Sequence, residues 1–298
     1  MKKNILVAGA TGNLGMRICR DLIKRDANVI ALVRNESDPE KIKDLLALGA
    51  EIAAVNFDNV EEIAAACKGV NVVVSVLAGL RDVVVDLQKH LLDGAILAKV
   101  PRFIPSDFCT DYNSLEPGQN RNFDLRREFK AYLDGTPIRA SSVFNGAFAD
   151  ILKYNTPVLN LKTNSISYWG EKADWKLDFT TMNDTAAFTA EVALDDEAPR
   201  NLQIASFQIS PAMILDEVRK ITDRHFAMQK IAGMDEFAEF IVKQRAENPG
   251  GENELYAKWQ QSQYLYSMFS THHQELANNR YPTLNWTGAA IYLKSFIK

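Results

Sequence analysis

The sequence predicts an α/β protein in which a doubly wound parallel sheet is followed by a smaller α/β unit. Short apolar runs alternate with amphipathic helical patterns from residue 5 to residue 143. The run at residues 70–76 is rich in β-branched residues, which is typical of a strand covered on both faces. A glycine-rich turn joins the first predicted strand to the first predicted helix. This alternation implies right-handed crossovers and a parallel sheet.

The glycine-rich turn narrows the range of possible functions more than any other stretch of the sequence. Gly9, Gly12 and Gly15 recur at every third residue after the apolar run at residues 5–8. The first glycine permits a tight turn, the second lets a ligand approach the main chain, and the third lets the helix pack on the strand. N–H groups at the helix start favour an anion, so we expect the pyrophosphate of a dinucleotide there, in a Rossmann-type site. Further contacts are expected from Thr11, Asn13 and Leu14.

Predicted strands and helices alternate through the first half of the chain. Strands are predicted at residues 5–8, 27–33, 51–55, 70–76, 102–105 and 137–143. Helices are predicted from residue 14 and at residues 39–48, 60–67, 82–99 and 123–133. Ligands of such sheets bind at the carboxyl ends of the strands. We therefore expect residues 1–150 to form the dinucleotide-binding domain.

The pattern loses its regularity beyond Asn145. Strands are predicted at residues 157–161, 165–169, 202–205 and 226–231, and helices at residues 183–193, 211–222, 234–244 and 252–269. Residues 151–298 are expected to form a smaller substrate-binding domain, with a boundary that interleaves with the first domain. This second domain would supply one wall of the substrate site.

Composition excludes several classes of function. The chain has 298 residues, of which 47% are hydrophobic, and its net charge of −4 argues against a nucleic-acid partner. No apolar run is long enough to span a bilayer. The three cysteines, Cys19, Cys67 and Cys109, lack C-x-x-C spacing, which favours free thiols in a reducing compartment. The N-terminus enters the first strand without a signal-peptide pattern, so we expect a cytoplasmic location.

Arg34 ends the second predicted strand, about 20 residues after the glycine turn. A site that prefers NAD usually carries Asp or Glu there, to hold the ribose 2′-hydroxyl. A guanidinium instead suits a 2′-phosphate as a bidentate partner. The sequence therefore predicts NADP(H) as the cofactor, with Lys41 or Lys43 as a source of additional positive charge.

Other candidate cofactor contacts follow later strands. Pro105 and Ser106 come directly after the fifth predicted strand and are expected beside the nicotinamide. Ser75 lies near the end of the fourth strand, and Phe144, at the end of the sixth, would pack on the nicotinamide. Asp107 would accept a hydrogen bond or orient a lysine.

Several of these stretches resemble the NmrA-like, isoflavone reductase-like branch of the atypical short-chain dehydrogenases/reductases. The likeness is carried by the turn with Thr11, by Arg34 after a valine, and by the segment R-F-I-P-S-D-F at residues 102–108. It continues at Asp184, before a helix, and in residues 281–296, which are similar to the family's final strand and helix. The resemblance therefore covers nearly the whole chain.

The resemblance implies an NADPH-binding Rossmann domain with a small C-terminal substrate domain. Plant members of this branch reduce phenylpropanoid, lignan or isoflavonoid substrates. Other members bind NADP and act as redox-sensing regulators without turnover. Two functions follow as alternatives: an NADPH-dependent reductase of a small aromatic or unsaturated substrate, and a non-catalytic NADP(H) sensor that binds a protein partner.

One departure from the family affects the choice between these functions. Reductases of the family carry a lysine in the helix before the sixth strand, a few residues after a phenylalanine. Here Phe123 is followed three residues later by Arg126, and Lys130 lies one helical turn further on the same face. Arginine cannot lose its proton and would act as an electrostatic clamp, whereas a lysine with a lowered pKa can act as acid or base. Arg126 and Lys130 both stay open as catalytic candidates.

Two further patterns are interpreted as coincidences. Tyr168 and Lys172 have the Y-x-x-x-K spacing of short-chain dehydrogenases, but they flank a predicted strand end and turn rather than lying on a helix. His272 and His273 have no third ligand at metal spacing, so no metal site is expected.

Overall fold

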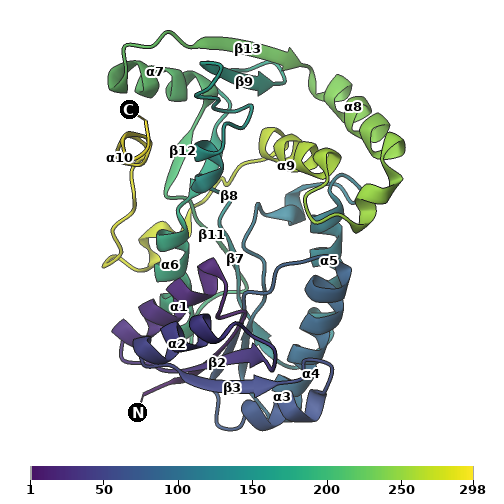
Figure 1. The fold of residues 1–298 in the computed structure, drawn as a ribbon, viewed down its shortest axis with the longest axis vertical. Coiled ribbons are helices and arrows are strands. Elements are labelled where there is room, and N and C mark those ends of the chain that lie inside the picture. The colour runs from purple at the N-terminus through teal and green to yellow at the C-terminus, as the bar shows by residue number, and fades with distance from the viewer. Residues whose placement is uncertain (1, 298) are drawn as a thin grey trace. The chain divides into compact units, whose positions relative to one another are not determined.

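The structure is a computed structural model, and it describes residues 2–297. The chain forms two compact units, and each unit is built from three separate segments of the chain (Figure 1). The first unit consists of Met1–Phe108, Phe123–Val143 and Thr185–Leu202. The second unit consists of Cys109–Asn122, Phe144–Asp184 and Gln203–Lys298. Each unit is described by itself below.

The first unit is organised around a six-stranded parallel sheet with the strand order β3-β2-β1-β4-β5-β6. Its strands are β1 (Asn4–Ala8), β2 (Asn28–Arg34), β3 (Glu51–Val55), β4 (Val72–Ser75), β5 (Arg102–Ile104) and β6 (Arg139–Ala140). The direction of winding reverses between β1 and β4, which is where open sheets of this kind bind ligands. The doubly wound α/β fold that the sequence predicts is confirmed.

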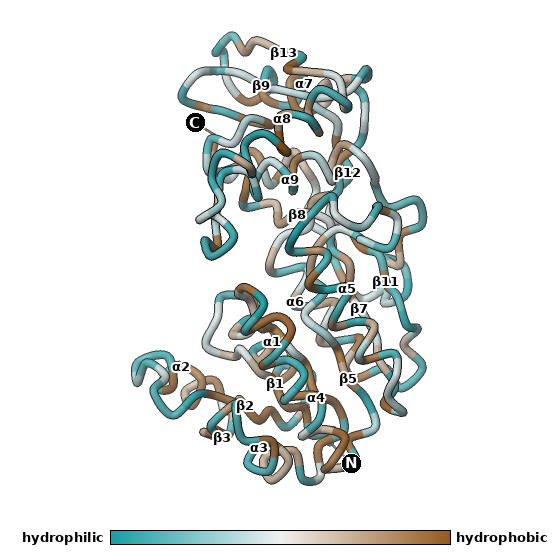
Figure 2. The backbone as a smooth tube through the Cα atoms, turned by 90° about the vertical axis from the view of Figure 1, so that its right-hand side faces the viewer, coloured by the Kyte–Doolittle hydropathy of each residue, from teal (hydrophilic) through white to brown (hydrophobic). Residues whose placement is uncertain are grey.

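Helices cover both faces of this sheet. They are α1 (Asn13–Lys24), α2 (Pro39–Leu48), α3 (Val60–Ala66), the π-helical turn η1 (Asp82–Leu87) with α4 (Gln88–Leu97), α5 (Arg121–Asp134) and α6 (Met182–Leu194). Leu6 of β1 and Phe103 of β5 belong to a core cluster that also contains residues of α3, α4 and α5. Ile5 and Val7, which point to the opposite face by strand alternation, are fully buried as well. Figure 2 shows hydrophobic stretches along β1 and β5.

The second unit has its own apolar core and several short sheets. Its elements are η2 (Tyr112–Ser114), β8 (Ala147–Phe148), η3 (Ala149–Lys153), β9 (Ser165–Trp169), β10 (Leu177–Thr180), β12 (Phe207–Ile209), α7 (Pro211–Ile221), β13 (Ala227–Ala232), α8 (Met234–Glu247), η4 (Pro249–Asn253), α9 (Lys258–Ser270), η5 (Ala277–Arg280) and α10 (Ala289–Lys294). Two short strands, β7 (Ser142–Phe144) and β11 (Asn201–Gln203), lie mostly in the first unit and end in the second. A three-stranded sheet has the order β12-β10-β8, and β13 pairs with β9. Trp169 stacks on Phe237 with ring centroids 4.8 Å apart, which fixes α8 against β9.

Several predicted elements are wrong in detail. No strand forms at residues 157–161, where the chain turns back and makes only single bridges. The strand predicted at residues 137–143 is split, because Ser141 donates its N–H to Phe103 of β5 whereas Ser142 donates to Arg200 beside β11. Residues 281–288 contain no strand, and the first six residues of the helix predicted at 82–99 form a π-helix.

Three further observations bear on predictions made from the sequence. Asp184 lies within α6 rather than before it. Tyr168 is on β9 and Lys172 lies in a bend, so this pair is not on a helix. None of the helices formed by residues 2–297 is both long enough and apolar enough to cross a membrane.

Close packing of α3 on α4 makes a test of the first unit's core. A Cβ added at Gly94 would lie 2.5 Å from Cγ2 of Ile63 and 2.8 Å from its Cβ. We expect Gly94→Ala to lower the free energy of unfolding by about 1–3 kcal/mol because two helices must move apart. Thermal unfolding should report a Tm lower by roughly 2–4 °C for each kcal/mol lost.

Gly135 is the matched control, because an added Cβ there would meet nothing closer than the Tyr132 carbonyl at 3.4 Å. Gly135→Ala should leave the Tm within about 2 °C of the parent. Equal Tm values for the two variants would show that the packing of α3 on α4 is looser than described.

Candidate functional site

The glycine turn between β1 and α1 lacks side chains where side chains would collide with the main chain. Gly9 has a φ of +82°, and a Cβ on it would lie 2.6 Å from the Val76 carbonyl oxygen. A Cβ on Gly15 would lie 2.2 Å from the Gly9 carbonyl oxygen. Gly12 donates its N–H to that same carbonyl at 3.0 Å. The turn is therefore as tight as the glycine spacing predicts, and larger residues at Gly9 or Gly15 would displace it.

Helix α1 begins at this turn with an N-terminus suited to an anion. Gly12 is the N-cap residue, no side chain caps the helix, and its first turn has no acidic residue. Thr11 is half-buried and Leu14 is buried, so the surface here is largely main chain. The dipole and the exposed amide donors of such a helix start favour a phosphate group.

Arg17 is a basic residue at this helix start that the sequence analysis missed. Its Nε donates a hydrogen bond to Oδ1 of Asn13 at 3.0 Å. The pair lies one helical turn apart, at the i, i+4 spacing that brings side chains together on one face. Asn13 is thus held by a cation close to the N-terminus of α1, and the spacing in the sequence was the available signal.

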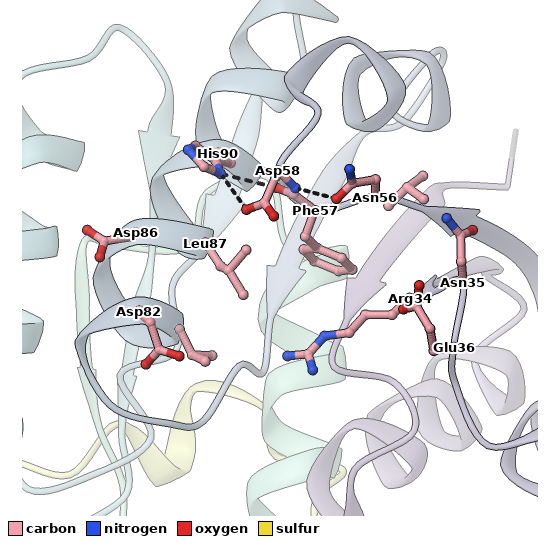
Figure 3. A pocket seen from close by; sticks show the side chains of 12 residues that line it. Arg34, Asn35, Glu36, Asn56, Phe57, Asp58, Asp82, Asp86, Leu87 and His90 are labelled. Carbon is pink, nitrogen blue, oxygen red and sulfur yellow. Dashed lines mark hydrogen bonds and ion pairs between the residues drawn. The ribbon is translucent and has the colours of Figure 1, made fainter. Parts of the chain in front are cut away.

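A pocket of about 670 Å³ lies at the carboxyl ends of β2 and β3 (Figure 3). Its lining residues come from the end of β2, from the end of β3 with the loop after it, and from η1 and α4: Arg34, Asn35, Glu36, Val55, Asn56, Phe57, Asp58, Asp82, Val83, Asp86, Leu87 and His90. Figure 3 shows the Arg34 side chain extending into this pocket near the ring of Phe57. All lining residues belong to the first unit.

Arg34 is a cation without a protein partner in this pocket. Among residues 2–297 its side chain makes no hydrogen bond and no ion pair, although it is exposed at the end of β2. His90 is held in place, with Nδ1 3.1 Å from the Phe57 carbonyl oxygen and 3.8 Å from the Asp58 carboxylate. Lys41 and Lys43, which were expected to add charge, do not line the pocket. The guanidinium is therefore available to an anionic ligand.

Ser106, just beyond β5, is bonded through its amide, its hydroxyl and its carbonyl. Its N–H donates to Oε1 of Gln88 at 2.9 Å, and its hydroxyl donates to the Leu77 carbonyl at 2.7 Å. Its carbonyl accepts a hydrogen bond of 3.2 Å from Nε of Arg126 on α5. Pro105, the preceding residue, is buried. The structure thus brings Arg126, rather than Lys130, to the end of β5.

Asp107, next along the chain, is a buried carboxylate that is hydrogen-bonded to a serine. Its carboxylate accepts a hydrogen bond of 2.7 Å from the Ser142 hydroxyl, which in turn accepts one of 2.5 Å from Arg200. Asp107 is 2% exposed, so these bonds compensate the desolvation of a buried carboxylate. The carboxylate thus accepts a hydrogen bond that secures the loop after β5, and orientation of a lysine by Asp107 stays a prediction.

Lys130 is engaged further along α5. Its Nζ donates to Asp134 at 2.5 Å, and the same carboxylate accepts hydrogen bonds from Arg200. Desolvation by burial raises the pKa of Asp134, but hydrogen bonds from Lys130 and Arg200 outweigh it and bring the pKa below its ordinary value. Lys130 thus serves an ion pair in the last turn of α5, whereas Arg126 reaches the end of β5.

The two remaining candidates occupy buried positions. Ser75 pairs with Ala8 next to the glycine turn, and its hydroxyl makes no hydrogen bond among the described residues. Phe144 belongs to the second unit, where its ring is fully buried edge-on against Tyr112, with centroids 5.4 Å apart. Contacts of Ser75 and Phe144 with the cofactor stay predictions.

The other reactive groups offer no competing site. Burial raises the pKa of the Cys19 and Cys67 thiols to about 12, so neither is a thiolate near neutral pH. No group of His, Cys, Asp and Glu within residues 2–297 could hold a metal ion. His273 is buried, with its backbone N–H donating to the Asp178 carboxylate and its Nδ1 3.2 Å from the Ile204 carbonyl oxygen. Among the described residues of the first unit, the glycine turn, Arg34 and Arg126 therefore remain the candidates for a site.

The family model described as the NmrA-like family matches residues 1–285. The chain belongs to the NmrA-like family. This confirms the resemblance carried by the glycine turn, by Arg34 and by residues 102–108. A bifunctional pinoresinol-lariciresinol reductase from Linum album is 27% identical, and the match covers 98% of this chain and 94% of that protein.

Solved structures show the same fold over the full length. A structure of AtPrR2 with NADP+ and (+)pinoresinol gives a TM-score of 0.81 at 23% identity, covering 100% of this chain and 99% of that one. A structure of isoflavone reductase gives a TM-score of 0.80 at 19% identity, with 100% of both chains covered. The fold of this chain is therefore one that solved structures already show.

The guanidinium of Arg34 in this pocket yields a test of cofactor choice. Arg34→Glu should weaken NADPH binding by about 10- to 100-fold, since charge-assisted hydrogen bonds contribute roughly 1.5–3 kcal/mol each. NADH binding should change far less, because NADH lacks the 2′-phosphate. Titration calorimetry with both dinucleotides measures the difference.

Lys41→Glu is the matched control for this charge reversal, because Lys41 is exposed and outside the pocket. It should leave the ratio of NADPH to NADH affinity unchanged. A parent and an Arg34→Glu variant with the same ratio would mean that the 2′-phosphate lies elsewhere.

Proposed function

We propose that this protein is an NADPH-dependent reductase of a small aromatic substrate of the lignan or phenylpropanoid type. The observation that carries the proposal is the pocket at the ends of β2 and β3, where the Arg34 side chain has no partner among residues 2–297. The glycine turn adds a main-chain cradle that a Cβ on Gly9 or Gly15 would fill. These residues fit a phosphorylated dinucleotide, and the similarity to pinoresinol-lariciresinol reductases supports a substrate of that kind.

Each group has a defined task in this proposal. The N-terminus of α1 and the turn hold the pyrophosphate, and Arg34 pairs with the 2′-phosphate. The reduced nicotinamide supplies a hydride when bound. Arg126, fixed by the Ser106 carbonyl, lies at the carboxyl end of β5, where ligands of open α/β sheets bind. Its guanidinium stabilises negative charge that develops on a substrate oxygen as the carbon accepts the hydride.

Arg126 changes one feature of the chemistry relative to a lysine. An arginine stays protonated at working pH, so it donates hydrogen bonds without transferring a proton. The proton that completes the reduction would then come from solvent, and the rate would show no titration of the cation. The Asp134 ion pair keeps Lys130 engaged elsewhere. The proposal therefore assigns Arg126 the electrostatic role and leaves Lys130 a structural one.

A second function is favoured by that same substitution. A chain without the family's lysine suits a non-catalytic NADP(H) sensor whose affinity for a protein partner depends on the bound dinucleotide. Such a sensor retains the pocket around Arg34 but needs no turnover. We also propose a cytoplasmic location, because the buried cysteines Cys19 and Cys67 form no disulfide among the described residues, as expected in a reducing compartment.

Turnover by the purified protein tests the reductase proposal. With NADPH in excess, we expect oxidation of the cofactor by pinoresinol or by a member of a panel of enones, quinones and cyclic ethers. Arg126→Met should lower kcat by about 10²- to 10³-fold, the usual cost of removing a donor that stabilises developing charge. Steady-state absorbance of NADPH provides the measurement.

Arg127→Met is the matched control, because Arg127 is the next residue on α5 and pairs with Asp124 at 2.7 Å. It should retain activity within a few-fold of the parent. Tight NADPH binding without turnover of any compound in the panel would overturn the reductase proposal in favour of the sensor. Equal affinity for a protein partner with and without the bound dinucleotide would in turn exclude the sensor.

A further inference from the structure

The wall of the Arg34 pocket is formed in part by an unusual helical turn. Residues Asp82–Leu87 form the π-helix η1, which continues directly into α4. Such turns are rare and occur frequently at functional sites. Asp82, Val83 and Leu87 of this turn line the pocket. Gly79 makes room for it, because a Cβ there would lie 2.6 Å from Cβ of Val83.

Gln88 joins this turn to the loop after β5. Its Nε2 donates to the Val84 carbonyl at 2.8 Å, within the π-helical turn. Its Oε1 accepts the Ser106 N–H at 2.9 Å. Gln88 is 1% exposed, so both hydrogen bonds are made in the interior, where an unpaired donor or acceptor costs free energy. One buried amide therefore ties the pocket wall to Ser106.

Ser106 connects Gln88 to Arg126 through hydrogen bonds. Its hydroxyl is bonded to Leu77, its N–H to Gln88, and its carbonyl to Nε of Arg126. A rotation of the Ser106 backbone that broke the hydrogen bond from its N–H to Gln88 would also move its carbonyl oxygen. That oxygen is the one that accepts the hydrogen bond from Arg126. The orientation of the guanidinium thus depends on a side chain on a different helix.

A second set of contacts holds the same two helices together. Arg81, just before η1, forms a bidentate ion pair with Glu128, which lies two residues after Arg126 on α5. Lys89, next to Gln88, lies 3.6 Å from the same carboxylate. These pairs are partly exposed and contribute little stability alone, but they fix the spacing between η1 and α5. Gln88 then sets the finer geometry from the interior.

We propose that Gln88 is a positioning residue that fixes the Arg126 guanidinium through Ser106. Its catalytic consequence rests on the proposed reductase function, whereas its geometric consequence does not. A displaced cation costs rate out of proportion to the distance moved, since reacting groups depend on alignment at the ångström scale. Gln88 has no direct part in the chemistry.

Substitution of Gln88 by methionine removes both hydrogen bonds at similar volume. In a ¹H–¹⁵N spectrum, the Arg126 Nε–Hε cross-peak, assigned by its loss in Arg126→Lys, should shift or broaden in Gln88→Met. The same variant should lose about tenfold in kcat. Gln263→Met is the matched control, because Gln263 is 2% exposed and its Oε1 accepts the Arg121 N–H at 3.0 Å in the second unit. The control should leave the cross-peak in place.

Gln88→Glu supplies a test that does not depend on how well the methionine variant folds. A protonated glutamic acid can donate to Val84 and accept from Ser106 as glutamine does, whereas the carboxylate cannot donate. Burial raises the pKa of such a carboxyl, so the change should occur between about pH 5 and 8. The Arg126 cross-peak and kcat of Gln88→Glu should match the parent at the acid end and depart from it as the pH rises.

The outcomes separate the two proposals. An Arg126 cross-peak that is unchanged in Gln88→Met, or that does not titrate in Gln88→Glu, overturns the positioning role. Cross-peak changes as expected, in a protein that turns over none of the substrate panel, retain the positioning role and reject the reductase. A loss of kcat in Gln263→Met as large as that in Gln88→Met would reduce the effect to general destabilisation and also overturn the proposal.

Discussion

The site depends on how closely the main chain of the first βα turn approaches itself. At Gly9 and Gly15, atoms of the backbone occupy the space that a side chain would need. That approach brings the start of α1 beside the ends of β1 and β2, where Arg34 extends into its pocket. The proposed dinucleotide site needs both the helix start and the guanidinium, and the turn sets the position of the first. The fold around the turn serves to hold this arrangement in register.

Much of this arrangement follows from local sequence. The glycine spacing specifies the turn because steric exclusion acts within a few residues, and the apolar runs specify strands buried on both faces. Arg34 is a candidate for the 2′-phosphate because a strand end beside such a turn has a known neighbour, the ribose of the adenosine, and this contact stays a prediction. The ion pair between Lys130 and Asp134 could also be predicted from the sequence, because an i, i+4 spacing on a helix predicts an ion pair.

Other features depend on contacts between distant segments and left no local signal. The π-helical turn has the same apolar spacing as an α-helix, so residues 82–99 were interpreted as one regular helix. Asp107 meets Ser142 and Ser106 meets Gln88 only after the sheet has formed. The strands β10 and β12 are three or four residues long and pair with one another across α6 in sequence, which periodicity alone does not detect.

The central claim is that this chain binds a phosphorylated nicotinamide dinucleotide through the glycine turn and Arg34. Calorimetric titration of the intact protein with NADPH, NADH and 2′,5′-ADP tests it most directly. The account predicts saturable binding of NADPH, weaker binding of NADH by about tenfold or more, and measurable binding of 2′,5′-ADP, because the 2′-phosphate supplies part of the affinity. Absence of binding heat for all three ligands, or equal affinity for NADPH and NADH, would contradict it.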